Sequence, residues 1–398
     1  MWATVLPERT TIGIPVSVGN TVAFTTERIV APIEGMHRAI ADRWFGIAGP
    51  IGEPVRVAHD SISSAVYRSL RLGGTALGMG LDYGLNVSEE RADMVQAWVN
   101  GLWGDGFGER EPRLAIKMGI RDSAGQPVRI DALEDVYPRP SGRIVVLVHG
   151  LTDTERCWVG NGVQPGLAET LEADPELSPV AIRYNTGLRI SDNGAELAAL
   201  LEHLMAQWPV PVESIALVGH SMGGLVCRSA CAVAQEAGFR WIERLDDVVA
   251  LGSPHRGAPL EKLVNVVGWG LGISPETQPL ADFLKGRSSG IKDLRFGAIV
   301  EDDWAGVDSD ALLRDTIGNH TLPAGVGHHF VAGVVTADPQ HPIGVVMGDL
   351  LVRAASGTGS QRLEPDNVEV VGSTRHSDLR NNPVVIDHVM GWLAPPAT

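Results

Sequence analysis

One serine of this chain has the neighbours that covalent catalysis requires. Residues 214–225 read Ser-Ile-Ala-Leu-Val-Gly-His-Ser-Met-Gly-Gly-Leu. An apolar strand runs into Gly219-His-Ser221-Met-Gly223 and a helical stretch follows, which is the setting of a nucleophile elbow. The serine of an elbow lies on a strained backbone, and side chains two positions before and after it would collide, so both places go to glycine. The pattern predicts that Ser221 is a nucleophile.

The pattern indicates a catalytic serine only if the chain also supplies a base and an acid for it. With 47 glycines among 398 residues, a bare Gly-x-Ser-x-Gly arises by chance roughly 0.3 times in such a chain. A serine hydroxyl needs a base to take its proton, and the base needs a carboxylate that fixes its tautomer and stabilises its charged form. On folds with an elbow, the order along the chain is serine, acid, histidine.

Two of the twelve histidines follow Ser221 in the required order, His376 and His388. His376 follows a strand expected over 368–371, through a loop that places it at the carboxyl edge of a sheet. His388 lies inside an amphipathic closing helix, where a structural role is the ordinary outcome. We predict His376 as the base, with His388 as the alternative.

The acid is expected after the strand predicted over 329–335. Asp338 follows at once and precedes a proline, where an acid is commonly a turn residue. Asp349 is flanked by Gly348 and followed by apolar residues that could bury it. Burial suits a carboxylate that is hydrogen-bonded to imidazole, so we predict Asp349, with Asp338 as the alternative.

Two backbone N–H groups are candidate donors to the oxyanion of an acyl-transfer reaction. The N–H of Met222 lies at the start of the elbow helix, where the helix dipole helps. The second is the N–H of Leu151, in the loop after the apolar strand 145–148. Gly150 lets the backbone turn there, and His149 is expected to be a structural side chain.

Strands that alternate with helices must position these residues. Strands are expected over 143–149, 179–184, 215–218, 247–251, 329–335 and 368–371, and helices over 165–172, 192–207, 225–237 and 384–393. A hairpin is expected from 114–120 and 127–131, with its turn at Ala124-Gly125. The alternation predicts an α/β fold with a mostly parallel sheet and helices on both faces.

Two further segments are set apart by their patterns. Residues 255–328 hold aromatic residues among many Gly, Asp and Ser, with no clear strand. We interpret them as a cap over the crevice at the carboxyl ends of the strands. Residues 1–110 predict an N-terminal helical extension, with helices over 32–45, 54–72 and 89–102. It is expected to be a packing layer or a dimer surface, with docking to a membrane or a partner as the alternative. The catalytic domain is then 111–398.

Composition excludes several classes of partner. The net charge of −16 disfavours nucleic acid and anionic membranes, which need clustered Lys and Arg. We expect no membrane span, since no apolar run approaches ~20 residues, and no secretory signal in residues 1–24, hence a cytoplasmic location. Three cysteines make no disulfide framework, and Cys227 and Cys231 are expected as buried side chains. No strong metal motif occurs, so no cofactor or metal is expected.

Five motifs give the chain a family resemblance. They are Val-His149-Gly150-Leu, Gly-His-Ser221-Met-Gly-Gly, Gly252-Ser-Pro-His255-Arg-Gly257, Gly348-Asp349-Leu-Leu-Val and His376-Ser-Asp-Leu. In this order, over about residues 112–398, the chain resembles bacterial lipases and esterases of the α/β-hydrolase superfamily, above all the branch with GPI-inositol-deacylase-like hydrolases. The extension matches nothing in that pattern.

The resemblance has consequences for the site. It favours Asp349 as the acid, because in that family the acid lies in a Gly/Asn-Asp-Gly-Leu-Val segment; here Leu350 stands where the family has glycine. Some such lipases bind calcium through an aspartate two residues after the catalytic histidine. Asp378 occupies that place, but no second carboxylate ligand is evident from the sequence.

These observations predict a serine hydrolase with an α/β-hydrolase fold. Its substrate is expected to be a small-molecule or lipid ester with an apolar acyl chain, and peripheral contact with a membrane is compatible with that substrate. An acyltransferase that uses the same acyl-enzyme is the alternative reaction. A binding module with a relic triad is a third reading.

Overall fold

The computed structural model describes residues 18–48, 89–107, 114–255, 257, 288–305, 322–341, 349, 352–359 and 363–394, with nine single residues between 56 and 75. Most of the cap expected over 255–328 lies outside the described residues. The same holds for most of the helix expected over 54–72.

The described residues form one seven-stranded sheet with the order β1-β3-β2-β4-β5-β6-β7. Its strands are β1 Gly119–Arg121, β2 Arg143–Val148, β3 Ser178–Arg183, β4 Ser214–His220, β5 Leu245–Leu251, β6 Gly327–Gly333 and β7 Asn367–Val371. All neighbours are parallel except β1, which runs antiparallel to β3. The predicted α/β-hydrolase fold with a mostly parallel sheet is confirmed.

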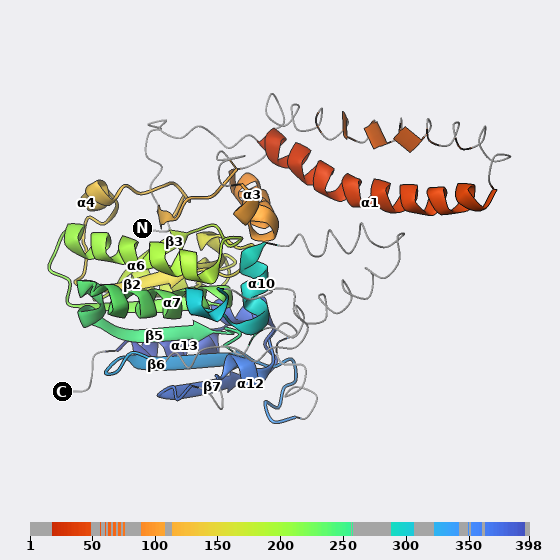
Figure 1. Ribbon diagram of the computed structural model, residues 1–398. Helices are drawn as coiled ribbons and strands as arrows, with labels where there is room; N and C mark the ends of the chain where they lie inside the picture. The colour runs from red at the N-terminus through yellow and green to blue at the C-terminus, as the bar shows by residue number, and fades with distance from the viewer. Residues whose placement is uncertain are drawn as a thin grey trace.

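Helices cover both faces of the sheet (Figure 1). On one face lie α6 Ile190–Gln207 and α7 Met222–Ala237, and on the other lie α5 Leu167–Ala173 and α13 Pro383–Trp392. Because successive strand residues point to opposite faces, Val146 joins the core under α6 and α7 while Val145 joins the core under α5 and α13. Cys227 and Cys231 lie in the first core, as predicted for buried side chains.

The predicted hairpin is shorter than expected. Its first strand is limited to β1, and its second contributes a single bridge, between Arg121 and Pro127. The turn forms where it was predicted: Gly125 has φ 81°, and its N–H donates to the carbonyl of Asp122. Pro127 has no N–H to donate, so the ladder cannot grow there, and the chain turns into a 3-10 helix at Ile130–Ala132.

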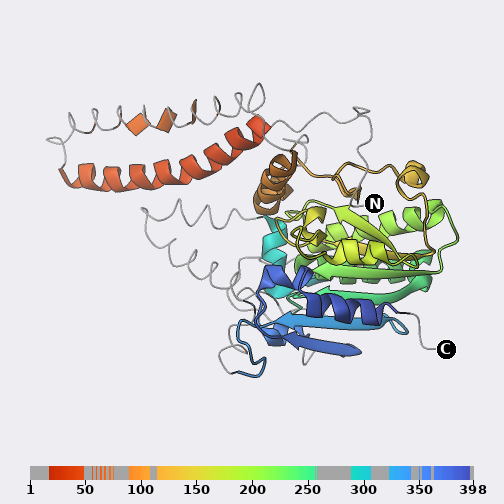
Figure 2. The same ribbon diagram turned by 180° about the vertical axis from the view of Figure 1, so that it is seen from behind.

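Two helices of the extension lie among the described residues. The helix predicted from Pro32 begins earlier, and α1 spans Val18–Ala48 with Pro32 inside it. A proline removes one hydrogen bond from a helix interior, and in this long helix it does not set the start. The helix predicted over 89–102 is confirmed as α3 Glu89–Trp103. Figures 1 and 2 show α1 extending away from the sheet domain, whereas α3 lies against it.

No helix in the described ranges combines the length and the apolar character that a membrane span needs. The cytoplasmic location stays a prediction.

Candidate functional site

Ser221 lies in a strained elbow between β4 and α7. Its backbone has φ 52° and ψ −119°, a conformation that L-residues seldom adopt. The strand β5 holds the elbow, since the N–H of Ser221 donates to the carbonyl of Leu251 over 2.8 Å. A Cβ on Gly219 would collide with the backbone of Gly224, and a Cβ on Gly223 would collide with the carbonyl of Val148. The second glycine is therefore required by the end of β2 rather than by the first glycine.

His376 and Asp349 form a buried pair. His376 opens the 3-10 helix η7 His376–Arg380 after β7, and its Nδ1 lies 2.7 Å from Asp349 Oδ2. Asp349 is 1% exposed, and its second oxygen accepts from the N–H of Val352 over 2.8 Å. A carboxylate accepts, so Nδ1 of His376 carries the hydrogen and Nε2 is left with its lone pair. This is the tautomer that a general base needs.

The alternative residues lie elsewhere. Asp338 is exposed, and its carboxylate accepts from the N–H of Gln340 over 2.9 Å, as in a turn. His388 lies on α13, stacked on Trp392 with ring centroids 5.6 Å apart. The structure thus brings Asp349, rather than Asp338, to His376.

The end of β5 contacts both the backbone of Ser221 and the imidazole of His376. Leu251 binds the backbone of Ser221, and the next residue, Gly252, lies against the imidazole of His376. A Cβ on Gly252 would come within 3.2 Å of His376 Cε1, and its φ of 63° also favours glycine. Two consecutive residues at the end of β5 therefore contact the nucleophile elbow and the imidazole of His376.

The loop after β2 adjoins the elbow. A Cβ on Gly150 would lie 3.2 Å from Cβ of Ser221. The carbonyl of Gly150 accepts from the N–H of Asp153 at 3.2 Å and from Nδ1 of His149 at 2.9 Å. In a trans peptide the N–H points opposite to the carbonyl. These two bonds therefore fix the direction of the Leu151 N–H.

His149 is held by Tyr184. The two rings stack with centroids 4.5 Å apart, and the Tyr184 hydroxyl donates to the His149 carbonyl over 2.8 Å. Burial lowers the pKa of His149 to about 3, so the ring is neutral. These contacts are those of a structural histidine. Met222, the other predicted oxyanion donor, is fully buried at the start of α7.

The described part of residues 255–328, the segment predicted to form a cap, borders this site. It contains α10 Ser289–Phe296. The preceding residue, Ser288, binds the end of α3: the Ser288 N–H donates to the Leu102 carbonyl at 2.9 Å, and the Ser288 hydroxyl donates to the Gly101 carbonyl at 2.6 Å. A Cβ on Gly290 would lie 2.9 Å from Cε of Met222. Helix α3 of the extension and α10 of the cap thus meet next to a predicted oxyanion donor.

A buried carboxylate holds α10 to the start of α6. Asp293 is 3% exposed and accepts from Arg189 Nη1 at 2.8 Å and from the N–H of Ile190 at 3.0 Å. Burial outweighs the guanidinium and raises the pKa of Asp293 to about 7. An acid whose folded pKa is raised contributes stability below its unfolded pKa of about 3.8, and that contribution is lost as the pH rises through the folded pKa.

Asp293→Asn should therefore change the pH dependence of stability. Between pH 4 and pH 7.5, the free energy of unfolding of the wild type should fall relative to that of the variant by on the order of 3 kcal/mol. Urea unfolding of both proteins at the two pH values measures this difference. If the free energies of unfolding of the wild type and the variant differ by the same amount at both pH values, the pKa of Asp293 is not raised in the folded protein.

Asp378 occupies the place at which some of the lipases that the sequence resembles bind calcium. Here it caps its own turn. It is exposed, and its carboxylate accepts from the N–H of Arg375 over 3.4 Å. Within the part of the chain that the structure describes, no three His, Cys, Asp or Glu side chains are grouped so that they could hold a metal ion.

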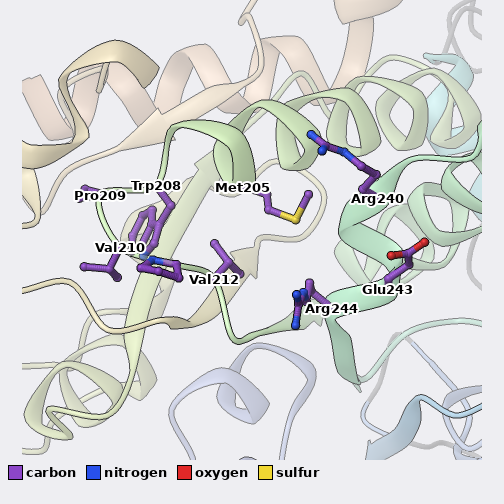
Figure 3. A pocket seen from close by; sticks show the side chains of 9 residues that line it. Met205, Trp208, Pro209, Val210, Val212, Arg240, Glu243 and Arg244 are labelled. Atoms are coloured by element: carbon purple, nitrogen blue, oxygen red, sulfur yellow. The ribbon is translucent and has the colours of Figure 1, made fainter.

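A recess lies at the amino ends of β4 and β5, remote from Ser221 at the carboxyl end of β4. Its walls come from the end of α6, the following loop and the turn before β5, and Figure 3 shows Trp208, Arg240 and Arg244 among them. These elements precede β4 and β5, whereas Ser221 follows β4. Seven residues of extended strand span roughly 20 Å, so this recess does not belong to the Ser221 site.

Three contacts around the site were not predicted from the sequence. Tyr184 follows β3 and binds His149, Arg380 of η7 pairs with Asp153 of the loop after β2, and His220 binds the backbone of His376. For His220 a signal was present, because a polar residue in an apolar strand directly before Ser221 needs a partner. The other two contacts join segments that are far apart in the sequence.

Comparison with known proteins gives one family match. The model of the family described as PGAP1-like alpha/beta domain matches residues 195–267, which hold most of α6, then β4, the elbow, α7 and β5. No curated protein matches the chain.

Several solved structures are similar to the chain. The mature form of Bacillus licheniformis lipase BlEst2 is 19% identical at a TM-score of 0.44, over 64% of this chain and 94% of the lipase. An α/β-hydrolase fold protein from Chitinophaga pinensis is 11% identical at 0.38, over 64% and 90% of the two chains. Phospholipase PlaB from Legionella pneumophila is 16% identical at 0.40, over 64% and 60%.

Proposed function

We propose that this protein is a serine hydrolase that cleaves carboxylic esters with an apolar acyl chain. The observation that carries the proposal is the buried His376–Asp349 pair at 2.7 Å, which lies against the same turn of β5 that holds the backbone of Ser221. Nucleophile, acid and base follow one another along the chain in the order of an α/β-hydrolase triad.

Each residue has a defined role in the reaction. The Oγ of Ser221 attacks the ester carbonyl while Nε2 of His376 takes its proton, and Asp349 stabilises the imidazolium that forms. The N–H groups of Leu151 and Met222 hold the oxyanion. His376 then protonates the leaving alcohol, and the acyl group stays on Ser221. A water molecule, deprotonated by His376, releases the acid and restores the serine.

The sequence of the cap supports an apolar acyl chain. Trp269, Leu271 and Phe283 occur in it among polar residues, and pockets that bury most of a ligand are lined mainly by apolar and aromatic side chains. A small-molecule or lipid ester, with or without peripheral contact to a membrane, fits this description.

Hydrolysis of p-nitrophenyl esters of increasing acyl length tests the proposal. We expect turnover that rises from acetate to longer acyl groups. A profile that peaks at the shortest esters would contradict the apolar acyl preference, and no turnover at any length would favour a binding module. Product analysis in the presence of an added alcohol distinguishes an acyltransferase, which would form a new ester in preference to the free acid.

Tyr184→Phe should slow the reaction without weakening substrate binding. The variant loses the hydroxyl that holds the His149 carbonyl, so the loop that directs the Leu151 N–H is held less firmly. Loss of a whole oxyanion donor costs about 10²–10³ in kcat, and we expect about tenfold here, with KM within about twofold. Tyr137→Phe is the matched control, because its hydroxyl donates to Pro179, at the other end of β3. Equal effects of the two variants would contradict this role for Tyr184.

A further inference from the structure

His220 occupies the position directly before the proposed nucleophile. It closes β4, it is 3% exposed, and its ring centroid lies 4.9 Å from that of His376. Its Nε2 lies 3.0 Å from the backbone carbonyl oxygen of His376. Because a carbonyl only accepts, Nε2 carries the hydrogen of the neutral ring and donates it to the residue that supplies the base.

The other edge of the same ring faces the oxyanion loop. A Cβ on Gly150 would lie 3.0 Å from Nδ1 of His220 and 3.2 Å from Cβ of Ser221. The imidazole of His220 thus fills the space between the loop that supplies the Leu151 N–H and the backbone of His376. Since Ser221 is the next residue in the chain, His220 adjoins all three parts of the proposed machinery.

The charge state of His220 suits this place. Burial, then the neighbouring His376 and Arg380, hold the pKa of His220 well below its ordinary value, with a smaller contribution from His149. The ring is therefore neutral when His376 takes up a proton from Ser221. A second cation 4.9 Å away would oppose that step, whereas a neutral donor to the His376 carbonyl does not.

We propose that His220 is a positioning residue for ester hydrolysis, whose Nε2–H fixes the backbone of His376 and so sets the imidazole against Ser221. This inference rests on the proposed function. The proposed effect is one of position. Proton transfer needs heavy atoms within hydrogen-bond reach, and a misplacement of about 1 Å can cost 10²-fold in rate.

Three substitutions separate positioning from simple core packing. In His220→Gln the side-chain amide places an N–H near the position of Nε2, in His220→Asn the amide is too short to reach the His376 carbonyl, and His220→Leu keeps the volume without a donor. We expect kcat to fall ten- to a hundredfold in His220→Asn and His220→Leu, with KM within about threefold. His220→Gln should recover most of the lost kcat.

The control is a buried histidine near the amino end of β6. His329 is 5% exposed, and its Nε2 lies 2.9 Å from Asp247. His329→Gln should lower the melting temperature but leave kcat unchanged. Thermal melting of every variant shows whether a loss of kcat follows a loss of folded protein.

The outcomes distinguish this inference from the proposed function. A folded His220→Asn or His220→Leu protein with the kcat of the wild type would overturn the inference, as would a His220→Gln protein no faster than His220→Asn. If His220→Leu does not fold, the comparison of the two amides decides. A folded wild-type protein that hydrolyses no ester and reacts with no serine-directed probe would instead contradict the proposed function.

Discussion

Asp349→Asn is expected to lower kcat/KM for ester hydrolysis by about four orders of magnitude. The amide has the shape of the carboxylate but no charge, so it cannot stabilise the imidazolium of His376. Its NH₂ group can also donate to Nδ1, which would hold His376 in the tautomer whose Nε2 carries the hydrogen. Initial rates with a p-nitrophenyl ester at substrate concentrations below KM measure the effect.

Asp338→Asn is the matched control for this experiment. Asp338 is the other acid that the sequence allows, and its carboxylate caps a turn at the surface. We expect kcat/KM of this variant within about twofold of the wild type, because the Asp338 carboxylate binds the backbone of its own turn and His376 binds Asp349. A large loss in Asp338→Asn together with a small loss in Asp349→Asn would assign the acid to the turn after β6 and contradict the triad proposed here.

Glu155→Gln should destabilise the fold by about 3–5 kcal/mol, the usual cost of removing one partner of a buried ion pair. Glu155 is fully buried, and its two oxygens accept from Nε and Nη2 of Arg183 at 2.6 and 2.5 Å. Arg183 is 5% exposed and also donates to Asp93 of α3 at 2.8 Å. The variant leaves a buried guanidinium with one carboxylate instead of two. Urea unfolding at pH 7 measures the free energy of unfolding.

An exposed ion pair provides the control for Glu155→Gln. Arg129 and Asp131 lie 2.5 Å apart on the surface, where solvent screens the interaction. Asp131→Asn should leave the free energy of unfolding nearly unchanged. If both variants unfold at the same urea concentration as the wild type, the Arg183 network does not stabilise the fold.

The sheet could be predicted because its strands carry unambiguous patterns. Residues 144–148 are a continuous apolar run, and a fully buried parallel strand has that composition. The elbow could be predicted because Gly219-His-Ser221-Met-Gly223 stands between an apolar strand and a helical stretch, although the clash that requires Gly223 comes from the end of β2. Asp349 and His376 followed from the order of the strands, and the structure brings them within hydrogen-bond distance.

Features that depend on distant segments could not be predicted. The sequence signal at Pro32 indicated a helix start, but α1 begins at Val18 and contains Pro32. The network of Arg183 joins residues 93, 155 and 183, and no local pattern shows that they meet. The contact of α3 with α10 was not foreseen for the same reason, whereas packing of the extension against the main domain was one of its expected roles; the division of the chain at residue 110 remains a proposal.

The central claim is that Ser221 is a nucleophile activated by His376. Incubation of the folded protein with a fluorophosphonate, followed by intact-mass measurement and peptide mapping, tests it most directly. We predict a single covalent adduct on Ser221 in the wild type and none in Ser221→Ala. A folded wild-type protein that stays unlabelled, or an adduct that persists in Ser221→Ala, would contradict the account.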